Sequence, residues 1–260
     1  MFNRFALLTV AGLALAAATS SASASNFTIN WLNQSTPSFG PAVPFGGVVP
    51  SGVIYNDPNF GLVQITYSAP AVGFSQVRNT DPQTQNGTIV SGPDTYTFGA
   101  HENFARTNLG PLTGGLALPS SWGMTYRFLS GPVPAGSLVV GITGLGATTS
   151  FGGGASNAMV FQNGTFLGDW QTGTTYGATQ FTPGVGMFTL QNSVTGAGGI
   201  NPHWNTALGV SLINATVSSL SLEFTQLPGD GVGVNIGFVP SPGAAALLGL
   251  GGLLAARRRR

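Results

Sequence analysis

The chain has 260 residues, of which only 6% are charged, and it contains no cysteine and no lysine. Nucleic-acid binding is excluded because it needs several basic residues on one face, and only three arginines lie between the two ends of the chain. The missing residue types also exclude a P-loop lysine, a Schiff base, a thiol nucleophile, a disulfide and a thiolate metal site.

The N-terminus has the pattern of a secretory signal peptide. Arg4 precedes an apolar run over residues 5–18, and small residues follow as far as Ser25. Ala22 and Ala24 form an A-x-A site, which predicts cleavage after Ala24 and a signal peptide of residues 1–24. The alternative is an uncleaved anchor, but an apolar run of about 14 residues is too short to span a bilayer comfortably.

Apolar and polar residues alternate with the period of β-strands through the middle of the chain. The clearest alternation covers residues 27–31, 63–68, 95–98, 124–128, 219–224 and 232–238. Shorter candidate strands cover residues 138–142, 158–161, 186–190 and 208–214. Turn signals such as Asn86-Gly87 and Asn163-Gly164 separate these runs, and no segment has a persuasive amphipathic helix pattern.

This pattern predicts an all-β fold, with one antiparallel, jelly-roll-like β-sandwich over residues 25–238. The alternatives are a β-solenoid and two small sandwiches. No fixed repeat period is visible, which argues against the solenoid. The stretch from residue 144 to residue 154 is rich in glycine and is the expected long loop. It would also be the boundary between two sandwiches.

The C-terminus, residues 239–260, combines three features. Pro240-Ser241-Pro242 precedes an apolar run from Gly243 to Ala256, and the chain ends in Arg257, Arg258, Arg259 and Arg260. As a helix, the apolar run would rise ~21 Å, which a bilayer with a ~30 Å core can accommodate by local thinning. We expect a short transmembrane helix with the arginines on the cytoplasmic side. The alternative is a buried core helix, which four consecutive charges disfavour.

This tail resembles the PEP-CTERM sorting signal of Gram-negative bacteria, which has a Pro-Glu-Pro-like motif, a short transmembrane helix and a basic cluster. Ser241 stands where that family usually has glutamate, and the resemblance covers about 22 of the 260 residues. It implies recognition near Pro240-Ser241-Pro242-Gly243 by an exosortase, a membrane-embedded processing enzyme. It also implies a host that makes an exopolysaccharide or a comparable envelope matrix. The tail is then either cleaved or a permanent anchor.

Candidate catalytic and metal-binding residues are few. His101-Glu102 lacks the second histidine of a zinc HExxH motif, and His203 lies in an expected loop. Residues 79–87 offer oxygen ligands for calcium but lack the acidic residues of an EF-hand. A glycosidase would need two carboxylates beside a cleft; the candidates are Asp94, Glu102, Asp169 and Glu223. We therefore expect no catalytic residue, no metal and no cofactor.

Trp170 and Trp204 each follow a polar residue and are candidate contacts for sugar rings, although half-buried tryptophans at a sandwich edge are the simpler interpretation. The leading prediction is an exported, non-enzymatic, structural or adhesive protein of the cell surface or extracellular matrix. Its low-charge surface would hydrogen-bond to exopolysaccharide. The alternative is a secreted carbohydrate-binding module or glycoside hydrolase. A cleft with tryptophan and paired carboxylates would favour the alternative, and flat polar sheet faces would favour the first prediction.

Overall fold

The computed structural model describes residues 24–34, 37–39, 50–68, 74–80, 87–98, 104–109, 120–146, 155–170, 177–193, 208–226 and 231–240. Several sequence predictions fall outside these residues: most of the signal peptide, the tail after Pro240, both histidines, Glu102, Trp204 and most of the candidate calcium stretch.

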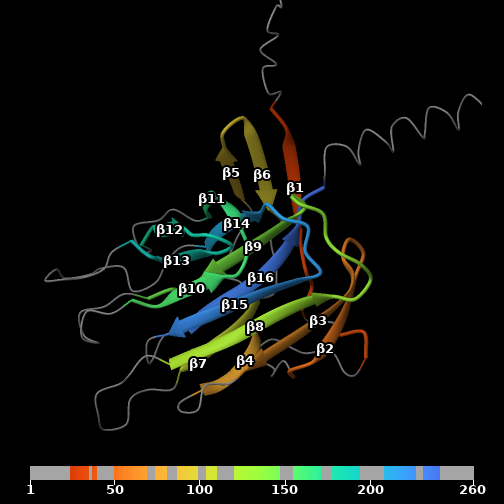
Figure 1. The fold of residues 1–260 in the computed structure, drawn as a ribbon, viewed down its shortest axis with the longest axis vertical. Coiled ribbons are helices and arrows are strands. Elements are labelled where there is room, and N and C mark those ends of the chain that lie inside the picture. The colour runs from red at the N-terminus through yellow and green to blue at the C-terminus, as the bar shows by residue number, and fades with distance from the viewer. Residues whose placement is uncertain are drawn as a thin grey trace, which may run out of the picture.

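The described residues form sixteen strands and no helix (Figure 1). None of them belongs to a helix that could cross a membrane. The strands are β1 (Asn26–Trp31), β2 (Val53–Asp57), β3 (Gly61–Ser68), β4 (Phe74–Thr80), β5 (Gly87–Ser91), β6 (Asp94–Phe98), β7 (Phe104–Leu109), β8 (Ser120–Phe128), β9 (Leu138–Thr143), β10 (Asn157–Val160), β11 (Gly164–Trp170), β12 (Thr179–Pro183), β13 (Phe188–Asn192), β14 (Leu208–Ile213), β15 (Ser219–Gln226) and β16 (Gly231–Phe238).

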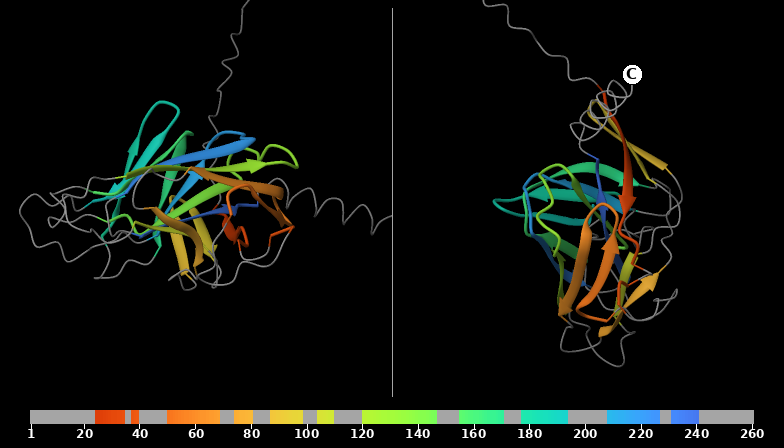
Figure 2. Two further views of the ribbon diagram at one scale, coloured as in Figure 1. Left: turned by 90° about the horizontal axis from the view of Figure 1, so that it is seen from below. Right: turned by 90° about the vertical axis from the view of Figure 1, so that its right-hand side faces the viewer.

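These strands make two sheets that pack against each other (Figures 1 and 2). The nine-stranded sheet has the order β11-β14-β9-β16-β1-β6-β5, and β7 pairs with β16 and with β4. The seven-stranded sheet has the order β12-β13-β10-β15-β8-β3-β2. The described pairings are antiparallel except for that of β1 with β6. The prediction of an all-β fold with two largely antiparallel sheets is confirmed.

Alternation along β15 shows how the sequence fixes the inner face of the seven-stranded sheet. Leu220, Leu222 and Phe224 are buried between the sheets, whereas the residues that alternate with them face outward. The ring of Phe224 stacks on the buried indole of Trp122 in β8 at a centroid distance of 4.2 Å. This face of the sheet therefore forms the main hydrophobic core together with the nearer face of the nine-stranded sheet.

The central strands of the nine-stranded sheet are buried on both faces. In β9, Leu138, Val140 and Ile142 belong to the main core, and Val139 belongs to a second hydrophobic core on the opposite face. Strand β14 behaves in the same way, since Ile213 lies in the main core and Val210 in the second one. A continuous apolar run is the expected sequence of a strand that is covered on both sides.

Strands β1, β6 and β5 cover this second face. Trp31 of β1 stacks on Phe98 of β6 at 5.6 Å, and Phe27 stacks on Tyr96 at 5.1 Å. At the far edge, a Cβ on Gly168 of β11 would lie 2.9 Å from Cγ2 of Ile89 in β5. The two ends of the nine-stranded sheet thus approach each other around the second core.

A buried amide network fixes the chain where it leaves β1. The side chain of Asn235, on β16, is fully buried and accepts a hydrogen bond from Nε2 of Gln34 at 2.6 Å. Its Nδ2 donates to the carbonyl of Leu32 at 3.0 Å, and the Leu32 N–H donates to the carbonyl of Ile236 at 2.9 Å. Both backbone groups of Leu32 are therefore satisfied inside the protein, as buried polar groups require.

Gly141 in β9 provides a test of the second core. A Cβ at this position would lie 2.5 Å from Cη2 of Trp31, so alanine would force the indole out of its place. We expect Gly141→Ala to lower the free energy of unfolding by about 1–3 kcal/mol in urea denaturation.

The control is Gly123→Ala in β8, where the nearest atom to the new Cβ would be the Ser68 hydroxyl oxygen at 3.3 Å. It should change the stability by less than about 0.5 kcal/mol. Trp31→Phe removes the ring atoms that would clash with the methyl group introduced by Gly141→Ala, so the double variant should lose less than the sum of the single losses. Strict additivity would contradict the contact between β1 and β9.

Candidate functional site

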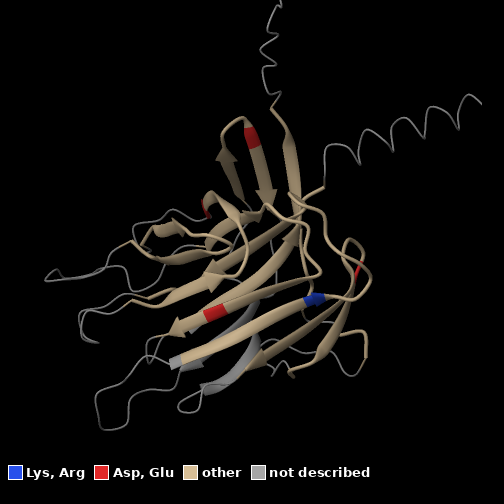
Figure 3. Cartoon of the chain, viewed as in Figure 1, with Lys and Arg blue, Asp and Glu red and all other residues tan. Residues whose placement is uncertain are grey.

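The described carboxylates are dispersed over the molecule. Asp57 ends β2, Asp94 begins β6, Asp169 lies near the end of β11 and Glu223 lies on the outer side of β15 (Figure 3). Among the described residues, no group of three or more His, Cys, Asp or Glu could hold a metal ion. The structure therefore does not bring together the described members of the carboxylate set that a glycosidase would need.

Asp169 is a half-buried carboxylate whose two oxygens have different surroundings. Its Oδ2 accepts a hydrogen bond from the backbone N–H of Thr179 at 2.8 Å, whereas its Oδ1 is buried without a hydrogen-bond partner. Burial raises the pKa of Asp169, and hydrogen bonding from Thr179 opposes that rise. Trp170, which follows it, ends β11 and pairs with Leu208 of β14. A carboxylate held in this way can accept a proton, and among the described residues it belongs to no group of three or more His, Cys, Asp or Glu.

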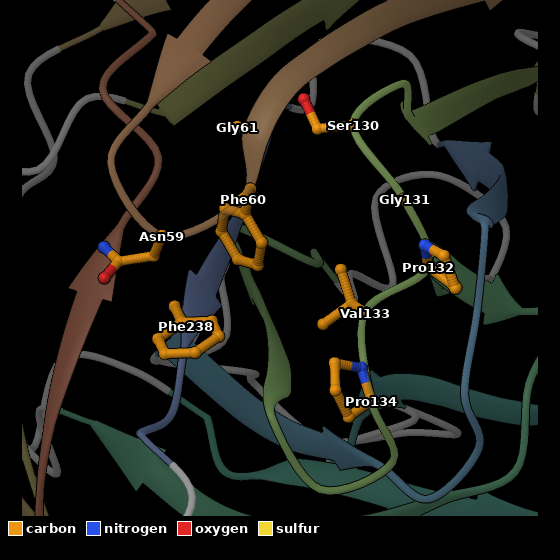
Figure 4. A pocket seen from close by; sticks show the side chains of 9 residues that line it. All are labelled: Asn59, Phe60, Gly61, Ser130, Gly131, Pro132, Val133, Pro134 and Phe238. Carbon is orange, nitrogen blue, oxygen red and sulfur yellow. The ribbon is translucent and has the colours of Figure 1, made fainter. Parts of the chain in front are cut away.

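A pocket of about 250 Å³ lies where β16 ends (Figure 4). Its apolar wall contains Phe60, Val133 and Phe238, and the rings of Phe60 and Phe238 meet edge to face at 5.6 Å. The other described lining residues are glycines, prolines, Asn59 and Ser130, so no titratable side chain is among them. The described lining thus offers apolar contacts and two neutral polar side chains.

The outer side of the seven-stranded sheet is a mostly polar surface, which we call the polar face. It carries outward side chains of six strands, and the charged residues among them are Glu223 of β15 and Arg127 of β8, in the strands where Figure 3 shows red and blue. Met159 of β10 lies between Glu223 and Thr189 and is an apolar member of this face. The polar and charged members are Gln64, Thr66, Ser68, Thr125, Arg127, Asn157, Gln180, Thr182, Thr189, Gln191, Ser219, Ser221, Glu223 and Thr225.

The register of the sheet places hydroxyl groups in a row across the polar face. Thr66 of β3 lies opposite Thr125 of β8, which lies opposite Ser221 of β15. The hydroxyls of Thr125 and Ser221 are 3.0 Å apart and share a hydrogen bond. Phe161 continues the row, since its N–H donates to the Ser221 carbonyl at 3.0 Å and its side chain is 37% exposed. Hydroxyls beside an exposed aromatic ring can hydrogen-bond to a sugar and contact its apolar face.

Trp170 and Trp204 are the aromatic contacts that the sequence predicts. Neither Phe161 nor the row of Thr66, Thr125 and Ser221 is predicted from the sequence. The threonines and serines could have been found from their outward positions in the alternating runs. Their alignment with Phe161 depends on strand register, which local alternation does not specify.

Comparisons of the chain with protein-family models, curated proteins and solved structures found no match. The function is therefore inferred from the polar face, the dispersed carboxylates and the two ends of the sequence.

Replacing Asp169 by asparagine tests the desolvated carboxyl. Because burial raises the pKa of Asp169, this carboxyl binds a proton more tightly in the folded protein than in the unfolded chain. The free energy of unfolding therefore falls as the pH rises through the folded pKa and the carboxyl ionises. The amide of the variant would keep an oxygen to accept the Thr179 N–H. We expect Asp169→Asn to be at least as stable as the wild type at pH 7 and to lose this advantage as the pH falls toward 4. If the free energies of unfolding of the two proteins, measured by urea denaturation, differ by the same amount at every pH, the raised pKa of Asp169 is contradicted.

Proposed function

We propose that the protein is an exported, non-enzymatic component of the cell surface or extracellular matrix, and that its polar face binds exopolysaccharide. The observation that carries this proposal is the polar face itself, where the described residues are mostly hydroxyl and amide side chains and include one acid and one base. Such a surface can exchange hydrogen bonds with a neutral polysaccharide without paying the desolvation cost of many charges. Structural or adhesive contact with the matrix is the role it fits best.

Export and sorting are the second part of the proposal. A signal peptide of residues 1–24 is removed after Ala24, and the tail of residues 239–260 directs sorting by an exosortase-type enzyme at the inner membrane. The β structure supports this division, because its first strand begins at Asn26 and its last ends at Phe238, just inside the two predicted signals. The protein then lies outside the inner membrane, with its tail as a transient or permanent anchor.

We further propose that the domain is an elaborated jelly roll. Support comes from four nested antiparallel pairs: β7 with β16, β8 with β15, β9 with β14, and β10 with β13. These pairs alternate between the two sheets, as they would if one long double strand were rolled up. The other eight strands then extend this framework at its edges.

The alternative is a secreted carbohydrate-binding module, which the exposed ring of Phe161 beside the hydroxyl row favours. A glycoside hydrolase has less support, since the described carboxylates are dispersed. A binding module would select a defined oligosaccharide on a glycan array, whereas a matrix protein would bind the long polymer and show little preference for short sugars.

The hydroxyl row can be removed by combining Thr66→Ala, Thr125→Ala and Ser221→Ala. Each lost hydrogen bond is worth about 0.5–1.5 kcal/mol, so we expect the dissociation constant for isolated matrix polysaccharide to rise at least about tenfold in co-sedimentation. The matched control combines Thr28→Ala, Thr88→Ala and Thr97→Ala, a row of exposed threonines across β1, β6 and β5. An equal loss of affinity for the polysaccharide in both triple variants would show that the polar face is not the binding surface.

The tail is tested by intact-mass analysis of the protein recovered from its producing bacterium. Moving each arginine through hydrocarbon costs ~2.5–3.5 kcal/mol, so transfer should stop at the apolar segment with Pro240-Ser241-Pro242 just outside it. We expect the mature protein to end near this motif and to lack Arg257 to Arg260. A mature protein that keeps the arginines is permanently anchored and refutes exosortase processing. Replacing all four arginines by serine should release more full-length protein.

A further inference from the structure

The first described residues are held at their start by a carboxylate. The backbone nitrogen of Ser25 donates to Oδ1 of Asp94 at 3.1 Å, and the Ser25 carbonyl accepts from the N–H of Thr95 at 2.9 Å. Both Ser25 and Asp94 are half-buried. Directly after this contact, Asn26 and Phe27 of β1 pair in parallel with Thr95 and Tyr96 of β6.

Signal-peptide removal would change the chemistry of this contact. Hydrolysis adds water across the Ala24–Ser25 bond, leaving a carboxylate on Ala24 and an amine on Ser25 that takes up a proton near neutral pH. The nitrogen that donates to Asp94 as a neutral amide in the precursor is then a charged ammonium group. A charge-assisted hydrogen bond is shorter and stronger than a neutral one.

We propose that Asp94 is a built-in binding site for the mature N-terminus, so that cleavage after Ala24 replaces a neutral hydrogen bond with an ion pair and locks β1 in place. This inference rests on the cleavage site in the proposed function. Only cleavage after Ala24 places the new amine beside Asp94, because cleavage at any other bond leaves the amine elsewhere.

The proposed ion pair acts on β1, the strand that covers the second core. Among the described strands, β6 and β5 are hydrogen-bonded to the rest of the nine-stranded sheet through β1 alone. Holding the start of β1 on β6 therefore keeps Phe27 and Trp31 against Tyr96 and Phe98. The uncleaved precursor lacks the ion pair, so the start of β1 is held on β6 less strongly until the signal peptide has been removed.

The groups around the amine are few. Strands β1, β5 and β16 contribute no titratable side chain in their described ranges, and β6 contributes Asp94 and Tyr96. The pKa of Tyr96 is raised by burial and, second, by the charge of Asp94. An α-amino group has an ordinary pKa of about 7.7–8.0, and pairing with Asp94 raises it. The added stability is therefore complete below about pH 7 and is lost as the pH rises through the raised pKa.

The chain offers an unusually clean measurement because it contains no lysine. The new N-terminus is then the only primary amine of the cleaved protein. We would export the full chain through its own leader, establish its N-terminus by mass spectrometry, and follow acylation by an amine-reactive reagent from pH 6 to pH 10. The amine of the wild type should titrate above the ordinary range, and Asp94→Asn should return it to about 7.7–8.0.

A second variant keeps Asp94 and moves the charge. One serine inserted between Ala24 and Ser25 makes the Ser25 nitrogen an amide again, and the new amine lies one residue away. The unfolding equilibrium constant of this variant at pH 6.5 should exceed that of the wild type by about two- to fivefold, and the two proteins should converge at pH 10. In the Asp94→Asn background, the insertion should have no such effect.

Three outcomes are possible. A Ser25 N-terminus with an amine pKa that falls on Asp94→Asn supports the inference. A Ser25 N-terminus with the same amine pKa in both proteins overturns it and leaves the export proposal intact. An N-terminus at another residue refutes cleavage after Ala24, and the inference fails with it.

Discussion

Strand β9 is apolar on both faces, and the arrangement of the remaining strands follows from the need to cover both of them. One face of β9, with Leu138, Val140 and Ile142, packs against the seven-stranded sheet, as in any two-layer sandwich. Val139 points the other way and would meet water in such a fold, yet it is fully buried. Burying one such side chain is worth about 1.5–3 kcal/mol, and β14 adds more on the same face. The layer formed by β1, β6 and β5 supplies that cover, and Gly141 leaves the space into which the indole of Trp31 packs.

The end of β1 lies between the two cores. Trp31 packs in the second core and Leu32 packs in the main core, as expected for adjacent residues of an extended chain. The backbone groups of Leu32, which follows the strand, are buried here, and unpaired buried groups are costly. Asn235 and Gln34 meet this requirement, since the Asn235 amide binds the Leu32 carbonyl and is itself bound by Gln34. The polar pair in an otherwise apolar region is therefore part of the mechanism that closes the second core.

Much of the strand content could be predicted from alternation, whereas the way the strands pair could not. The runs at residues 219–224 and 232–238 became β15 and β16. Six strands were not predicted, because their sequences do not alternate cleanly: β2, β4, β5, β7, β11 and β12. Partners lie far apart in sequence, as in the pairing of Gly231 with Asn108, and local patterns carry no information on such distances. The same limit applies to the polar face. Its threonines and serines were predictable as outward residues, while the row from Thr66 to Phe161 exists only through the registers of β3, β8 and β15.

The first and last described strands are neighbours in the nine-stranded sheet. Strand β1 pairs antiparallel with β16 through its last residues, with Asn30 opposite Phe238, so the end of β16 lies beside the end of β1 (Figure 1). The last strand is fixed there by the N–H of Val239, which donates to the carbonyl of Ser137 at 3.0 Å. If the tail anchors the protein as proposed, tension on it would pass into β16, which is hydrogen-bonded on both sides. The polar face belongs to the other sheet, so this load would not pass along the strands that carry the proposed binding surface.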